Sequence, residues 1–166
     1  MHLRDDAAIF HIDCFGCTRN DTNYIYMNKN LIIFTDGGAR GNPGPAGIGV
    51  VIASDDGKTI SRHKKYIGEA TNNVAEYKAL ILALEEAVKI SNFQYPISNI
   101  QINMDSELVV RQMQGKYKIK EPTLKVLAQE VFSLINKFKN VEFTHVFREK
   151  NKEADKLVNE AIDEAG

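Results

Sequence analysis

Four acidic side chains hold positions in the sequence from which they could act on one substrate. Asp36 and Asp105 each directly follow a short apolar run, whereas Glu76 and Asp155 fall in the first turns of two helical patterns. Taken singly, each is most simply a turn residue, a helix cap or a partner of the helix dipole. Brought together, four carboxylates would repel one another unless cations neutralised them, and hard oxygen ligands in that number suit Mg²⁺ or Mn²⁺ rather than Zn²⁺. The sequence therefore predicts a divalent-metal site wherever the fold gathers these acids.

The apolar patterns predict the elements that would gather them. Expected strands span 30–35, 46–53, 59–67, 98–104 and 141–147, and expected helices span 71–90, 107–114, 122–137 and 152–164. Turn residues fill 37–45 and 55–58, so the first three strands should form an antiparallel meander. The long helix before the fourth strand favours a right-handed crossover that leaves strand four parallel to strand one. The carboxyl ends of these two strands, and with them Asp36 and Asp105, should then lie side by side.

Length and composition bound the class of protein. The chain has 166 residues, 43% of them hydrophobic, and a formal net charge of −1. That length suits one domain with its own core, and the balanced charge excludes a protein that binds nucleic acid by bulk charge alone. No apolar run approaches the ~20 residues of a membrane span, and no leader-like segment is visible at the start. Because two cysteines cannot make a disulfide framework, we expect a cytoplasmic protein.

The first 28 residues differ from the rest because they show no clear period of a helix or a strand. We expect residues 1–28 to form a weakly ordered N-terminal extension. Cys14 and Cys17 form a C-x-x-C pair there, and His2 and His11 could complete a zinc site. Because no second pair and no ordered pattern surround it, we favour the interpretation that this pair holds no metal.

Four motifs, in order along the chain, resemble those of type 1 ribonucleases H. They are FTDGGARGNPGPAGIG at 34–49, TNNVAEY at 71–77, MDS at 104–106 and NKEADKL at 151–157. The first motif is long and specific, and the resemblance runs from about Asn30 to the C-terminus. It implies that residues 29–166 form one catalytic domain of the α/β class with the ribonuclease H-like fold. That fold is a five-stranded mixed sheet of order 3-2-1-4-5, with strand 2 antiparallel, flanked by helices.

The resemblance also implies an activity, which is endonucleolytic cleavage of the RNA strand of an RNA–DNA hybrid, leaving 5′-phosphate and 3′-hydroxyl ends. Asp36 would bridge two ions of Mg²⁺ or Mn²⁺, Asp105 would hold the ion on the nucleophile side, and Asp155 would ligate or shape the other site. Glu76 would ligate metal and hydrogen-bond the ribose 2′-hydroxyl beside the scissile phosphate. Two ions can generate hydroxide and stabilise the leaving oxygen without a protein nucleophile. We expect a monomer that has no obligate protein partner and does not bind membranes.

Recognition of RNA requires a contact to the 2′-hydroxyl, which deoxyribose lacks. Small residues would let the sugar–phosphate approach the backbone, and these are Gly37, Gly38 and Ala39. By the resemblance, three amides would face the minor groove, and these are Asn42, Asn72 and Asn73. Thr71 would seat a phosphate of the DNA strand, cap the following helix, or do both.

The sequence departs from many family members in two places. It has no Trp and no Trp/Lys-rich basic protrusion, so a smaller basic patch or a solvated face is expected at Arg111, Lys116, Lys118, Lys120 and Lys125. Many members also place a mobile histidine before the last acid. His145 continues the alternation of its expected strand, which favours a structural role, and Arg148 or Glu149 could partly substitute for the missing histidine.

Two other functions stay open. A non-catalytic hybrid-binding domain would share the fold, although such a domain gains nothing from clustered negative charge near phosphates. A related nuclease of the same fold would act on double-stranded RNA or on branched DNA.

Overall fold

The computed structural model describes residues 29–93 and 96–166, so the expected N-terminal extension and the Cys14/Cys17 pair lie outside the described residues. Five strands form one sheet: β1 (Lys29–Ala39), β2 (Gly44–Ser54), β3 (Thr59–Ala70), β4 (Ile97–Met104) and β5 (Asn140–His145). Their order is β3-β2-β1-β4-β5. Strand β2 runs antiparallel to both of its neighbours, whereas β1, β4 and β5 are parallel. The predicted sheet is therefore confirmed.

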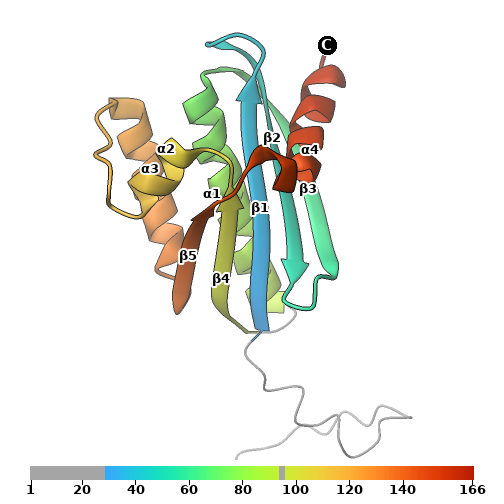
Figure 1. Cartoon of the computed structure of the whole chain (residues 1–166), viewed down its shortest axis with the longest axis vertical. Helices are drawn as coiled ribbons and strands as arrows, with labels where there is room; N and C mark the ends of the chain where they lie inside the picture. Colours follow the sequence, from blue (N-terminus) through green and yellow to red (C-terminus); the bar gives the residue numbers. More distant parts are fainter. Residues whose placement is uncertain (1–28, 94–95) are drawn as a thin grey trace, which may run out of the picture.

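Helices cover both faces of this sheet (Figure 1). They are α1 (Asn72–Phe93), α2 (Glu107–Met113), α3 (Pro122–Ile135) and α4 (Lys152–Asp163), and a short 3₁₀ helix, η2 (Arg148–Lys150), precedes α4. Helices α1 and α3 pack over the main hydrophobic core, in which Ile33, Ile102 and Leu80 are fully buried. Helix α4 lies on the opposite face, over β1, β2 and β3. Among the described residues, no helix combines the length and apolarity that a membrane crossing requires.

Local signals at the helix starts act as predicted. The backbone N–H of Val74 donates to Thr71 Oγ1 over 3.3 Å, so Thr71 caps α1. Pro122 occupies the first turn of α3, and the Glu121 carboxylate before it accepts hydrogen bonds from the N–H groups of Thr123 and Leu124. These contacts satisfy backbone donors that the first turn of a helix leaves unpaired.

Several strand boundaries differ from the prediction. Strand β1 continues through Asp36, Gly37 and Gly38 to Ala39, where a turn was expected, because these residues pair with β2 as far as Ala39 and Ala46. The backbone N–H of Arg40 then donates a hydrogen bond to the Pro45 carbonyl, with N and O 2.8 Å apart, and this bond closes a turn that is shorter than predicted. Strand β3 extends three residues beyond the predicted end, to Ala70, because it follows β2 to its start. Strand β5 ends at His145, before the exposed Phe147.

Two glycines let helices approach the sheet backbone. A Cβ atom on Gly37 of β1 would collide with the backbone of Ala75 in α1. One on Gly49 of β2, which pairs with Asp36, would collide with the carbonyl of Ala154 in α4. Neighbouring residues of a strand face opposite sides, so these glycines admit the two helices that carry Glu76 and Asp155.

The close approach of α4 predicts a stability change. Gly49→Ala should lower the free energy of unfolding by about 1–3 kcal/mol, because the added methyl group forces α4 away from β2. Denaturant unfolding measures the change. Gly38→Ala is the matched control, because its added methyl group would meet only a side-chain atom of Val158 at 3.4 Å. Equal losses in the two variants would contradict the explanation.

Candidate active site

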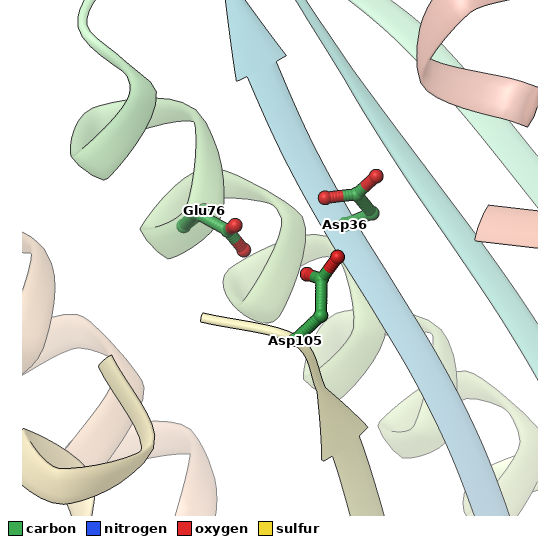
Figure 2. A group of neighbouring side chains, drawn as sticks. All are labelled: Asp36, Glu76 and Asp105. Atoms are coloured by element: carbon green, nitrogen blue, oxygen red, sulfur yellow. The ribbon is translucent and has the colours of Figure 1, made fainter. Parts of the chain in front are cut away.

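Three carboxylates from separate elements converge beside the C-terminal end of β4 (Figure 2). Asp36 comes from β1, Glu76 from the second turn of α1, and Asp105 from the residue after β4. One oxygen from each lies within 4.8 Å of the others. The parallel pairing of β1 and β4 places Thr35 opposite Met104, so the acids that follow these residues are neighbours. The expected convergence of these three acids is therefore present in the structure.

Burial, together with repulsion from neighbouring carboxylates, disfavours the charged forms of Asp36 and Glu76. Burial raises the pKa of Asp36 to about 7, with further contributions from the charges of Asp105 and Asp155. A backbone N–H bond at Gly37 and the charge of Arg148 act in the opposite direction. Burial, followed by the charges of Asp36 and Asp105, raises the pKa of Glu76 well above its usual range. A divalent cation at this point would replace the repulsion by attraction.

The donor set fits such a cation. Glu76 Oε2 is buried and has no hydrogen-bond partner among the described residues. A carboxylate oxygen left in that state costs free energy unless a ligand satisfies it. Because all three donors are hard oxygen atoms, the cluster could bind an ion of the Mg²⁺ or Mn²⁺ type.

Asp155, the fourth predicted acid, lies on the same cavity of about 400 Å³ but outside the tight cluster. Its Oδ1 atom accepts a hydrogen bond from Arg148 Nη2 at 2.6 Å, and Asn159 Nδ2 lies 3.4 Å from its Oδ2 atom. In this structure, Asp155 is therefore neutralised by Arg148. The lining of the cavity thus includes both a trio of close carboxylates and an ion pair.

Five of the seven predicted substrate-binding residues line the cavity, and they are Gly37, Gly38, Ala39, Asn72 and Asn73. Asn42 and Thr71 are not among the lining residues, but Asn42 is hydrogen-bonded to Asn72, which lines it, and Thr71 directly precedes Asn72. Asn72 Oδ1 accepts a bond of 2.8 Å from the Ala39 N–H, and the Asn72 N–H donates to Asn42 Oδ1 over 3.1 Å. These bonds occupy the side-chain carbonyl oxygens of Asn42 and Asn72, which leaves their NH₂ groups to donate to a ligand.

The other residues singled out from the sequence lie outside the cavity, except for Arg148. His145 is the last residue of β5, and its ring meets that of Phe147 edge to face with centroids 6.0 Å apart. Arg111 pairs with Glu107 of its own helix at 3.3 Å. The lysines of the expected basic patch are exposed and make no ion pair within the described ranges, and these are Lys116, Lys118, Lys120 and Lys125.

Two residues of the Asp155 environment escaped the sequence analysis as individual contributors. Asn159 follows Asp155 by four residues and reaches back to it, whereas Asn151 precedes it by four and is buried. The spacing i, i+4 on a helix was the available signal, because it places side chains on one face. It did not distinguish these asparagines from ordinary surface or capping residues.

The raised pKa of Asp36 predicts a pH-dependent gain in stability on its removal. Between the unfolded pKa of about 4 and the folded value of about 7, the unfolded chain releases this proton more readily, so rising pH destabilises the native state. In the presence of a chelator, Asp36→Asn should therefore raise the unfolding free energy at pH 8 by roughly 1–3 kcal/mol and change it little at pH 4. Thermal unfolding at both pH values measures the effect. If the Asn variant were no more stable than the parent chain at pH 8, ionisation of Asp36 would not destabilise the native state and the explanation would be wrong.

Comparison with known proteins places this geometry in a family. A family model described as "Reverse transcriptase-like" matches residues 34–161. Bifunctional protein Rv2228c of Mycobacterium tuberculosis is 43% identical over 136 residues, which cover 81% of this chain and 36% of that protein. Ribonuclease HI of Halobacterium salinarum is 41% identical over 132 residues, which cover 80% of this chain and 64% of that protein. The matched region thus spans about a third of the mycobacterial relative.

Solved structures agree with the sequence matches. The crystal structure of LC11-RNase H1 in complex with RNA/DNA hybrid superposes with a TM-score of 0.77 at 54% identity, covering 81% of this chain and 98% of that one. RNase H1 from the halophilic archaeon Halobacterium salinarum superposes with a TM-score of 0.75 at 39% identity, over 81% of this chain and 98% of that one. Shared sequence, shared fold and the carboxylate cluster where the end of β4 lies beside β1 together show that the chain belongs to the type 1 ribonuclease H family.

Proposed function

We propose that this chain cleaves the RNA strand of RNA–DNA hybrids as a metal-dependent endonuclease. The observation that carries the proposal is the convergence of Asp36, Glu76 and Asp105, with one buried oxygen of Glu76 left without a partner. A purely structural site would not retain such repulsion, since it lowers stability. The similarity to a solved RNase H1 bound to an RNA/DNA hybrid supports the choice of substrate.

The four acids would hold two Mg²⁺ ions, or Mn²⁺ ions in their place. Asp36 belongs to the cluster with Glu76 and Asp105, and the charge of Asp155 across the same cavity also acts on it, which suits a bridging ligand. Asp105 would serve the nucleophile side, and Asp155 would complete or shape the second site. When bound, two such ions activate water and stabilise the leaving 3′ oxygen, which would give 5′-phosphate and 3′-hydroxyl ends.

The asparagines beside the cluster would provide selection of the hybrid. The carbonyl oxygens of Asn42 and Asn72 are already bonded, whereas their NH₂ groups make no hydrogen bond within the described residues and can donate to a ligand. Donors suit the acceptors of a minor groove, which are ribose 2′-oxygens and base N3 or O2 atoms. Glu76 would accept a hydrogen bond from the 2′-hydroxyl next to the scissile phosphate. Thr71 caps α1 through its oxygen and retains its hydroxyl proton for a phosphate.

Arg148 would act where many family members place a histidine. Its guanidinium binds Asp155 through Nη2, and its other donors lie at an exposed position of the cavity wall. A guanidinium has five donors, so it can hold a carboxylate and contact a phosphate oxygen together.

We assign residues 29–166 to the catalytic domain and residues 1–28 to an appendage, and we expect a cytoplasmic monomer.

Cleavage of a labelled RNA–DNA hybrid tests the function. The parent chain should cut the RNA strand in Mg²⁺ and lose activity on chelation, and Asp36→Asn, Glu76→Gln or Asp105→Asn should each reduce kcat at least ~10³-fold by removing a metal ligand. Asp55→Asn, in the exposed β2–β3 turn, is the control that should retain activity. Equal rates for the parent chain and Asp36→Asn would refute the proposal. Binding without cleavage would indicate a hybrid-binding domain, and preference for double-stranded RNA or branched DNA would indicate a related nuclease.

The role of Arg148 predicts a selective kinetic defect. Arg148→Ala should lower kcat by roughly 10–100-fold, because it releases Asp155 and removes a cation beside the developing phosphate charge. Arg148→Lys should recover part of the loss. Arg62→Ala is the control, because Arg62 also pairs with an acid of α4, Glu153, but does not line the cavity. The assignment would be wrong if both alanine variants had the same steady-state rates.

A further inference from the structure

One buried amide connects the start of α4 to the strand that carries Asp36. The Asn151 side chain is 1% exposed, and its Nδ2 atom donates to the backbone carbonyl of Thr35 over 3.0 Å. Thr35 directly precedes Asp36, and the Asn151 carbonyl accepts the N–H of Asp155 in the first turn of α4. The path from Asp36 to Asp155 through this amide is therefore short and made of defined hydrogen bonds.

The other contacts of α4 set its distance from the sheet more than its orientation. Gly49 lets the Ala154 carbonyl lie against β2, and this contact is non-directional. The ion pairs to Arg62 and Lys64 are exposed, and such pairs contribute little to holding a helix in place. A hydrogen bond from a buried amide is directional, and losing its donor would remove a buried bond to the Thr35 carbonyl.

We infer that Asn151 is a positioning residue for Asp155 and Arg148. It does not line the cavity, so it acts through the placement of α4 and of η2, which ends at the residue before it. Metal ligation and in-line attack both tolerate only small errors, and a displacement of about 1 Å can cost ~10²-fold in rate. The inference rests on the proposed role of Asp155 at a metal site.

The test compares Asn151→Ala with Gln114→Ala. Gln114 Nε2 also donates to a strand carbonyl, that of Phe143, over 2.9 Å, but Gln114 directly follows α2 and does not line the cavity. Both variants should lower the unfolding midpoint. Only Asn151→Ala should weaken Mn²⁺ binding to the hybrid-free protein, by about 5-fold or more in titration calorimetry, and lower kcat about 10–100-fold. Its KM for the hybrid should stay within about twofold, because the asparagines proposed to bind the hybrid lie in α1 and the β1–β2 turn.

A double-mutant cycle with Asp155→Asn separates positioning from general damage. If Asn151 acts through Asp155, the Asn151→Ala change should cost little further kcat or Mn²⁺ affinity once Asp155 is replaced. Should Asn151→Ala fail to fold, Asn151→Gln carries the same cycle, because it retains the amide and moves it by one methylene.

The outcomes distinguish this inference from the proposed function. An inactive Asp155→Asn with normal Mn²⁺ binding and kcat in the Asn151 variant would overturn the positioning role and leave the nuclease proposal intact. Additive losses in the cycle would also overturn it. Full activity of Asp155→Asn would instead remove the proposed role of Asp155, and with it the basis of the inference.

Discussion

Repulsion among buried carboxylates is the constraint on which this structure depends. Asp36 and Glu76 are each less than one-tenth exposed, and both carboxyl groups are held where the charged form is disfavoured. A domain has a net stability of only about 5–15 kcal/mol, so a few kcal/mol of repulsion is a large fraction. The core between α1 and the sheet must offset this cost in the metal-free state. Binding of a cation would then release the repulsion, which couples metal affinity to stability.

Close packing of the helices on the sheet brings these carboxylates together into one site. The glycine at 37 admits α1 and the glycine at 49 admits α4, on opposite faces of adjacent strands. Each helix then brings one acid, Glu76 or Asp155, to the part of β1 where Asp36 lies. A methyl group at either glycine would move a helix, and the acid on it, by a distance that matters for ligand geometry. By allowing the two helices to approach the sheet, these glycines thus help to position acidic side chains that other elements carry.

Polar groups around the cluster are oriented before any substrate arrives. The Asn72 side chain accepts a hydrogen bond from the Ala39 N–H, and the Asn72 N–H donates one to the Asn42 side chain. The Arg148 guanidinium is oriented by its ion pair with Asp155. Such preorganisation reduces the free energy otherwise lost in ordering side chains on binding. It also suits a family member that lacks a Trp/Lys-rich protrusion, because a small number of fixed donors must then orient the hybrid.

Much of the fold followed from local signals in the sequence. The alternation of apolar residues and the crossover rule were enough to predict that Asp36 and Asp105 would be neighbours. Thr71 and Pro122 marked two helix starts, because the effects of capping residues and of proline act within a few residues. The tertiary structure alone decided three other features: β1 continues through Asp36 to Ala39, Asp155 pairs with Arg148, and Asn72 orders Asn42. Each depends on the distance between separate elements: β1 and β2, η2 and α4, and α1 and the β1–β2 turn. That distance is set by how closely whole helices and strands pack, which no pattern within one segment encodes.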